Sequence, residues 1–535
     1  MKKAIMTNKI MKKIVTALSL VCIPFIQESS LFAFDLHGSF SDHMVLQRDV
    51  PIKVFGTGAQ GESLRVSLGK DSKNITLDND GSWLVTLPAR TSSAESLKLS
   101  VSSQTKTIDL MDVVIGDVWI CSGQSNMGWG LKGTRPLPQS YPHSELIRVI
   151  TGKLIVSPHK ACESFMPDPR KSSKGWARAN EKTALETSAV SYYMARELVR
   201  RTDIPVGLIV VALGGSQIWP WMSPESIAGH PEEAMTRKEA ESEQKWATNH
   251  ALVLKKKGRG KDAERLLYSY SGKTPSALYN GMIYPLLKTP IAGMLWYQGE
   301  RSQDNPLPYR TLFPAAISGW RKAWGQGDFP FVFIQLPAYF GHGANTKRAR
   351  GFSLVREAQE MALKLPNTGM AMALDYGNYS DVHPQEKNEV GRRAALQALK
   401  LQGHDLVADG PMKSGILLKG SKAFIRFDSS AGGLETRKVL LPKSRGLIGS
   451  NDPEAFIVNK ERLEGFELCG KGGVFHKAQA RIIGKDTVEV SSPKVDNIKH
   501  IRYAFHQFPL CNLYNSEGLP ARPFRTDDFH VAYGK

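Results

Sequence analysis

The fold of this chain is decided by the stretch Gly207-Leu208-Ile209-Val210-Val211-Ala212-Leu213. A continuous apolar run of this length is typical of a strand that is buried on both faces of a parallel sheet. Runs of the same type occur at residues 292–297, 331–334 and 370–374. We therefore expect at least four buried parallel strands in the middle of the chain.

Helical patterns separate these runs. Between residues 185 and 201, apolar side chains recur at the offsets that place them on one face of a helix: Val190, Tyr193, Met194 and Leu198. Strands that alternate with helices predict a parallel sheet covered by helices. This texture extends from about residue 111 to residue 405, which we interpret as one α/β domain.

The regions on either side of 111–405 have a different texture. Short segments that alternate apolar and polar residues fill 34–110 and return in 406–535, for example in Ser82–Leu87 and Ala423–Phe427. Turn formers separate them, as is typical of β-sandwiches. At 535 residues the chain is also too long for a single core. We expect an N-terminal and a C-terminal β-domain around the α/β domain.

The first 33 residues resemble a secretory signal peptide. Five lysines precede an apolar stretch from Ile14 to Ile26, and Ala33 suits a cleavage site. The stretch is too short to span a bilayer, and no later stretch approaches the required length. We expect a secreted or periplasmic protein, with cleavage after the leader rather than lipidation at Cys22.

The chain is basic, with a formal net charge of +19. Such a charge raises the question of nucleic-acid binding. The densest basic run, Lys255–Lys261, lies between two polar helical stretches and has no aromatic residues nearby, so we interpret it as a solvated insert and expect no nucleic-acid partner. Hydrophobic and charged residues make up 41% and 23%, an ordinary globular balance.

Four cysteines follow the leader: Cys121, Cys162, Cys469 and Cys511. They show no close paired spacing, so the sequence does not predict a zinc site. An oxidising compartment permits a Cys469–Cys511 disulfide, which the sequence leaves open.

Polar residues follow the predicted strands at the edge of a parallel sheet where ligands bind. Ser125 follows Val118–Ile120, Gly214-Gly215-Ser216 follows the 207–213 strand, and Gln298-Gly299-Glu300 follows the 292–297 strand. Asp375, Asp381 and His383 follow the 370–374 strand. Together they form the set that acyl transfer needs.

We assign roles to these residues by their chemistry. Ser125 is the candidate nucleophile, and His383 is the base that activates it. The Ser125 N–H, the Gly215 N–H and the Gln298 side-chain amide are candidate oxyanion donors. We expect Glu300 to be a buried scaffold carboxylate.

The sequence offers two candidates for the orienting acid. Asp381 is favoured because residues i and i+2 of an extended stretch point to one side of the chain. Asp375 is the rival. Asp375, Asp381 and His383 would also suit a metal, so a metal-dependent hydrolase is an alternative, as is a non-catalytic glycan-binding protein.

These motifs carry a resemblance to the sialate O-acetylesterase family within the SGNH hydrolases. The site motifs that carry it are Gly123–Met127, Gly214–Ser216 with Trp219 and Trp221 behind it, Trp296–Glu300 and Asp381–Pro384. Outside the site, Phe40–Gln47, Leu278–Ile283 and Asn512–Asn515 also resemble the family. Together these matches extend over most of the chain after residue 33.

The resemblance implies a flavodoxin-like three-layer domain flanked by β-domains, with removal of O-acetyl groups from sugars and no cofactor or metal. The substrate would be an acetylated glycan, with acetyl-xylan or another carbohydrate as the alternative to sialic acid. Trp219, Trp221 and Arg301 are candidate substrate-binding residues. Two features depart from the family pattern: Arg301-Ser302 replaces the usual Ser-Asn, and Asp381-x-His383 is one residue shorter than the usual Asp-x-x-His. The sequence leaves the acetylated sugar and the oligomeric state open.

Overall fold

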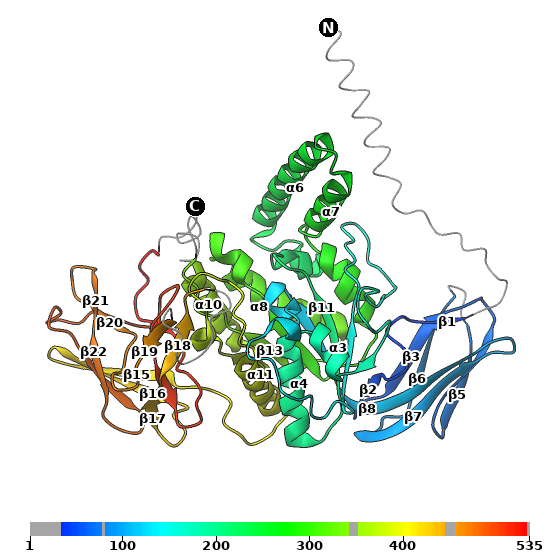
Figure 1. The fold of residues 1–535 in the computed structure, drawn as a ribbon, viewed down its shortest axis with the longest axis horizontal. Coiled ribbons are helices and arrows are strands. Elements are labelled where there is room, and N and C mark those ends of the chain that lie inside the picture. Colours follow the sequence, from blue (N-terminus) through cyan, green and yellow to red (C-terminus); the bar gives the residue numbers. More distant parts are fainter. Residues whose placement is uncertain (1–33, 78–80, 342–350, 445–454, 532–535) are drawn as a thin grey trace, which may run out of the picture.

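The computed structural model describes residues 34–77, 81–341, 351–444 and 455–531. The predicted leader at 1–33 lies outside these residues. The fold is mixed α/β, with one large mixed sheet and further β-sheets in the C-terminal part of the chain. Figure 1 shows helices around the large sheet in the middle of the molecule and β-structure at both ends.

Five parallel strands form the centre of the large sheet in the order β11-β8-β12-β13-β14. Their bounds are Val206–Ala212 for β11, Thr107–Gly123 for β8, Gly293–Tyr297 for β12, Phe331–Ile334 for β13 and Thr368–Ala371 for β14. Almost every residue of β11, β12, β13 and β14, and every residue of β8 from Val113 onward, is buried, as expected for strands covered on both faces. Since the strands are parallel, the segments that follow them meet at one edge.

Two more strands extend the sheet beyond β11. Strand β9 (Ile147–Thr151) pairs in parallel with β11, and β10 (Ala177–Arg178) pairs antiparallel with β9. The antiparallel edge makes the sheet mixed. Neither strand was predicted from the sequence.

Helices pack in pairs beside the sheet. Helix α4 (Ala189–Thr202) packs against α11 (Asn388–Leu401), and α8 (Tyr309–Trp324) packs against α10 (Gly351–Met361). The contact between α4 and α11 is close: a Cβ on Gly391 would lie 2.5 Å from the Tyr193 Cβ. The predicted apolar face of 185–201 is therefore the buried face of α4.

Strand β8 continues from the N-terminal β-structure into the central sheet. Its first part pairs with β7 (Ser93–Ser102) and β2 (Val45–Gln47), and its last part pairs with β11 and β12. Strands β4 (Ser63–Leu68) and β5 (Asp71–Thr76) extend this β-structure. Strands β1 (Asp35–Leu36), β3 (Ile52–Thr57) and β6 (Ser82–Leu87) form a second, three-stranded sheet. The strand that ends at the candidate nucleophile thus begins in the N-terminal β-region.

The C-terminal region contains two four-stranded sheets, at the left of Figure 1. One has the order β15-β16-β23-β22, with bounds Met412–Lys419, Lys422–Asp428, Thr487–Ser491 and Gln479–Ile482. The other has the order β21-β20-β24-β26, with bounds Phe475–Lys477, Phe466–Cys469, His500–Tyr503 and Phe524–Arg525. The short pairs β17–β25 and β18–β19 complete the region, with bounds Leu434–Thr436, Leu513–Asn515, Val439–Pro442 and Ala455–Val458.

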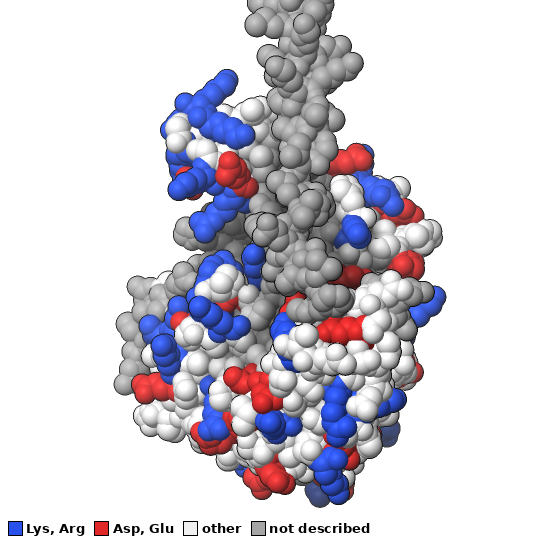
Figure 2. All heavy atoms as spheres, turned by 90° about the vertical axis from the view of Figure 1, so that its right-hand side faces the viewer, with Lys and Arg blue, Asp and Glu red and all other residues white. Residues whose placement is uncertain are grey.

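A helical hairpin projects from the body of the molecule, at the top of Figure 1. It consists of α6 (Glu233–Lys256) and α7 (Gly260–Ser271), and the basic run Lys255–Lys261 covers its turn. On the face shown in Figure 2, Lys and Arg side chains are interspersed with Asp and Glu. Among the residues described, no helix is long and apolar enough to cross a membrane.

Candidate active site

Ser125 lies directly beyond the carboxyl end of β8. Gly123 ends the strand with φ 143°, and a Cβ there would lie 2.2 Å from the Tyr297 carbonyl oxygen, so only glycine fits. The Gln124 N–H donates to the same carbonyl at 3.0 Å. Ser125 then begins the short helix α2 (Ser125–Gly128) and remains half-buried. The turn presents its hydroxyl at the edge of the sheet.

The structure brings Ser125 and His383 together. The His383 Nε2 lies 2.8 Å from the Ser125 Oγ, although the two residues are 258 positions apart in the chain. The indole of Trp129 stacks on the imidazole, with ring centroids 5.2 Å apart and an angle of 17° between the planes. The hydroxyl and the imidazole are thus within hydrogen-bonding distance, and the ring is held from one side.

Asp381 faces the other ring nitrogen. Its Oδ1 lies 3.3 Å from the His383 Nδ1 and accepts a hydrogen bond from the His383 backbone N–H at 2.9 Å. The Asp381 N–H donates in turn to Asn378 Oδ1 at 2.8 Å. The serine, the imidazole and this carboxylate therefore form a continuous line.

Asp375 lies elsewhere. Its carboxylate forms a two-pronged ion pair with Arg393 of α11, at 2.7 and 2.8 Å, and accepts a hydrogen bond from the Tyr514 hydroxyl at 2.8 Å. All three side chains are buried. The strong interactions of Asp375 thus join α11 to β25 of the C-terminal region, and no bond between Asp375 and His383 competes with them.

The turn after β11 lies against the nucleophile. A Cβ on Gly214 would lie 3.4 Å from the Ser125 Cβ, and Gly215 has φ 71°, which favours glycine. Within the described part of the chain, neither the Ser125 N–H nor the Gly215 N–H has a hydrogen-bond acceptor. Two backbone donors therefore remain available beside the Ser125 hydroxyl.

Gln298 is fully buried behind this turn. Its Nε2 donates to the Ser216 carbonyl at 3.1 Å, and its Oε1 accepts from the Tyr309 hydroxyl at 2.9 Å. These two bonds fix which end of the amide points toward the turn. Gln298 thus holds the 214–216 segment in place and retains one amide hydrogen for another acceptor.

A buried polar cluster lies behind the dyad. Asn126 donates to Glu300 Oε1 at 2.5 Å and to the Val382 carbonyl at 3.0 Å, and it accepts from the Lys387 Nζ at 2.7 Å. Burial raises the pKa of Glu300 and lowers the pKa of Lys387 to about 7. Glu300 is buried, as expected, and its side chain accepts a hydrogen bond from Asn126.

The structure separates the three candidate substrate-binding residues. Trp219 and Arg301 line one cavity, and Arg301 pairs with Glu243 at 2.5 Å and Asp304 at 3.2 Å. Trp221 is fully buried: its Nε1 donates to Ser216 Oγ, and its carbonyl accepts from Trp320. The assignment of Trp221 to substrate binding is therefore wrong, because its indole is part of the core and cannot contact a sugar directly.

Sequence reasoning gave no role to Asn126 or Lys387. The position of Asn126 beside the nucleophile was a usable signal, because its side chain must enter the site or the core. Lys387 gave no such signal, since a lysine near a helix start normally extends into solvent.

The cysteines and acids place further limits on the site. Cys121, Cys162, Cys469 and Cys511 are free thiols in this structure. Within the described ranges, no group of three or more His, Cys, Asp or Glu side chains is positioned to hold a metal ion. Asp375 is separated from Asp381 and His383 by its pairing with Arg393.

Comparison with known proteins adds an independent line of evidence. Residues 263–400 match the family described as carbohydrate esterase, sialic acid-specific acetylesterase. That range includes Gln298, Glu300, His383 and Lys387. The chain is 26% identical to human sialate O-acetylesterase over 564 residues, covering 96% of each protein. It is also 26% identical to the mouse sialate O-acetylesterase over 453 residues, covering 76% of this chain and 81% of the mouse protein.

A solved structure extends the likeness to three dimensions. A carbohydrate acetylesterase from Xanthomonas citri superposes with a TM-score of 0.75 at 29% identity, covering 93% of this chain and all of the other. The sequence, the family match and the structural likeness agree on one enzyme class. The chain is thus similar to sialate O-acetylesterases in sequence and to a carbohydrate acetylesterase in structure, and these similarities identify it as a carboxylic ester hydrolase of that type.

Proposed function

We propose that this protein is an exported serine esterase that removes O-acetyl groups from carbohydrates through an acyl-enzyme. The observation that carries the proposal is the 2.8 Å distance between the Ser125 Oγ and the His383 Nε2. A serine hydroxyl becomes an effective nucleophile when a base accepts its proton, and a neutral imidazole can do so near neutral pH.

The reaction begins with proton transfer and attack. The Nδ1–H of His383 faces Asp381, which leaves Nε2 as the acceptor for the Ser125 proton. The serine oxygen then attacks the acetyl carbonyl, and negative charge develops on the carbonyl oxygen. The Ser125 N–H, the Gly215 N–H and the remaining Gln298 amide hydrogen stabilise that charge.

The second half of the reaction restores the enzyme. The tetrahedral intermediate collapses, and the His383 imidazolium gives its proton to the departing sugar oxygen. Water then attacks the acetyl-serine with His383 again as the base. The imidazolium returns this proton to the Ser125 oxygen as the acyl bond breaks, and acetate leaves. Asp381 stabilises the imidazolium in both halves and keeps the ring in the required tautomer. The mechanism needs no cofactor.

We further infer a flavodoxin-like three-layer SGNH hydrolase domain at 111–405, between β-domains at 34–110 and 406–535. The parallel order β11-β8-β12-β13-β14 and the helix pairs α4–α11 and α8–α10 support it. Export is inferred from the composition of residues 1–33 alone. A polymeric glycan outside the cytoplasm would be accessible to such an enzyme.

Acetate release from a panel of O-acetylated glycans tests the proposal. The wild-type protein should release acetate from acetylated sugars and from an aryl acetate, without added metal and in the presence of a chelator. Ser125→Ala should release none while its circular dichroism spectrum matches that of the wild type. Activity that disappears with the chelator would replace the serine mechanism with the metal-dependent alternative.

A further inference from the structure

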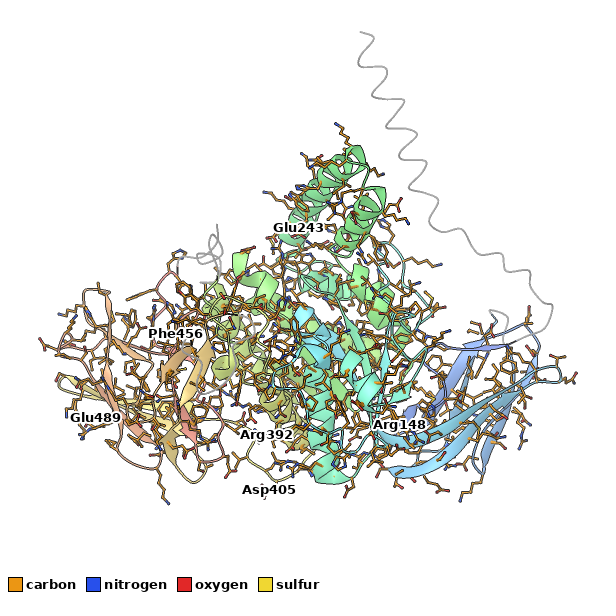
Figure 3. All side chains as sticks on the ribbon, viewed as in Figure 1. Arg148, Glu243, Arg392, Asp405, Phe456 and Glu489 are labelled. Atoms are coloured by element: carbon orange, nitrogen blue, oxygen red, sulfur yellow. The ribbon has the colours of Figure 1, made fainter. Side chains whose placement is uncertain are left out.

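A cavity of about 530 Å³ lies between the α6–α7 hairpin and the turns that follow β11 and β12. Trp219 and Arg301 line it from the two turns, Trp246 lines it from α6, and Tyr270 lines it from α7. Figure 3 labels Glu243, another lining residue, at the base of the projecting hairpin. The hairpin therefore forms one wall of a cavity whose other wall belongs to the catalytic edge of the sheet.

The cavity adjoins the nucleophile through its backbone. The Arg301 N–H donates to Gln124 Oε1 at 3.4 Å, and Gln124 directly precedes Ser125. On the other side, Gln217 lines the cavity two residues after Gly215, in the turn that lies against Ser125. The cavity and the nucleophile are therefore connected through Gln124 on one side and through the turn after β11 on the other.

The hairpin wall is built from stacked rings. Trp246, a residue that is 44% exposed, stacks on His250 with ring centroids 3.9 Å apart, and its ring centroid lies 5.0 Å from that of Tyr270. The Lys273 Nζ lies 3.4 Å from the Tyr270 ring centroid. Because four side chains support one another, the wall is preformed and presents apolar surface to the cavity. Exposed aromatic surface of this kind contacts the C–H faces of sugar rings.

The charges that line the cavity favour a neutral ligand. Glu239, Glu243 and Asp304 contribute three carboxylates. The lining contains one arginine, Arg301, which already pairs with Glu243 and Asp304, and Lys273 nearby pairs with Glu243 at 3.3 Å. Burial raises the pKa of Glu239, whose Oε1 accepts from Asn305. An anionic sugar would meet these acidic side chains while the cations are engaged, whereas sugar hydroxyls can donate to carboxylates.

We propose that this cavity is a subsite for an uncharged sugar ring of the acetylated glycan, with Trp246 as its apolar contact and Glu239 and Asp304 as acceptors for its hydroxyls. The inference rests on the proposed function, because it assigns the part of the substrate that lies beside the acetyl ester. It also predicts that a carboxylate on the ring at this position weakens binding.

Steady-state kinetics on three substrates test this subsite. They are an aryl acetate, acetylated neutral oligosaccharides of xylose and mannose, and an O-acetylated sialyl-oligosaccharide. The wild type should have a KM for a neutral oligosaccharide about tenfold or more below that for the sialylated one. Trp246→Ala should lower the ratio of kcat/KM on the neutral oligosaccharide to that on the aryl acetate by about tenfold. Glu239→Gln should reduce the discrimination against the sialylated substrate.

Glu241→Gln is the matched control. It removes a carboxylate from the same helix, but Glu241 is exposed and does not line the cavity, so all three substrates should behave as with the wild type. A preference for the sialylated substrate, or no release from the neutral oligosaccharides while the aryl acetate is cleaved, overturns the subsite. Kinetic ratios for Trp246→Ala and Glu239→Gln that match those of Glu241→Gln also overturn it. In each of these cases, cleavage of the aryl acetate that depends on Ser125 would still support the proposed function. If the aryl acetate were not cleaved, both the proposed function and the subsite would be excluded.

Discussion

The Asn126 side-chain amide donates to the Val382 carbonyl oxygen at 3.0 Å, and so joins the residue after the candidate nucleophile to the residue before the candidate base. The same side chain contacts Glu300 and Lys387. Ser125 and His383, which lie 2.8 Å apart, are therefore also connected through a buried polar cluster behind them.

Replacing Asn126 should affect both activity and stability. Asn126→Ala leaves the Glu300 carboxylate and the Lys387 ammonium group without that partner, so we expect the free energy of unfolding to fall by about 1–3 kcal/mol. The loop that carries His383 also loses its anchor, and kcat should fall. Urea denaturation and kcat on an aryl acetate measure the two effects.

Asn512→Ala is the matched control for this prediction. Asn512 is equally buried in the C-terminal region, where it donates to the carbonyls of Asn459 and Arg462. Its loss should lower stability and leave kcat near the wild-type value. Equal kcat values in the two variants would show that the Asn126 cluster does not position the dyad.

Replacing Asp381 should mainly lower activity, whereas replacing Asp375 should mainly lower stability. Asp381 lies beside the His383 Nδ1, so Asp381→Asn should lower kcat by up to about 10⁴-fold with little change in stability. Asp375 pairs with buried Arg393, so Asp375→Asn should instead cost about 3–5 kcal/mol of stability. Thermal unfolding measures the change in stability of each variant, and kcat on an aryl acetate measures the change in its activity. Near-wild-type activity in Asp381→Asn with a collapse in Asp375→Asn would reverse the assignment.

Gln298 should act on the rate rather than on ground-state binding. Gln298→Ala removes one oxyanion donor and the hydrogen bond to Ser216, and kcat should fall by about 10²–10³-fold with little change in KM. Tyr309→Phe removes only the hydroxyl that orients the amide, so its effect on kcat should be in the same direction and smaller. An unchanged kcat in Gln298→Ala would exclude the amide as a donor.

Lys387 should make stability depend on pH. Burial lowers its pKa to about 7 despite the opposing charges of Glu300, Asp381 and Glu386, whereas an unfolded lysine titrates near 10.4. At a pH between these two pKa values, Lys387 is neutral in the folded protein and protonated in the unfolded protein, so unfolding takes up a proton. The contribution of Lys387 to the free energy of unfolding therefore increases as the pH rises. Lys387→Met lacks this uptake, so the stability slopes of the two proteins should differ by up to about 1.4 kcal/mol per pH unit. Urea denaturation from pH 7 to pH 10 measures both, and parallel slopes would contradict the prediction.

The sequence identified the parts of the fold that hydrophobic burial determines. The runs at 207–213, 292–297 and 331–334 form β11, β12 and β13, because a strand covered on both faces must be apolar throughout. Strand β9 was missed, since Ile147–Thr151 contains Arg148, which is buried in an ion pair with Asp112. A charged residue whose partner is distant in the chain does not resemble a core residue.

The candidate site was predictable where function depends on residue type at a strand end. Ser125 and His383 lie within hydrogen-bonding distance because the ends of parallel strands meet at one edge. Lys387 and the α6–α7 cavity were not predictable, because they depend on how distant segments pack and not on a local pattern. The resemblance suggested Trp221 as a substrate-binding residue, but the structure buries it fully in the core.

The identity of the nucleophile is tested most directly by mapping the residue that a fluorophosphonate labels covalently. The account predicts one equivalent of label on the peptide that contains Ser125, loss of esterase activity in proportion to labelling, and no label on Ser125→Ala. His383→Ala should label far more slowly, because the hydroxyl then lacks its base. Label on Ser122 or Ser216 would contradict the account. Full labelling of Ser125→Ala, with the same loss of esterase activity as in the labelled wild type, would also contradict it.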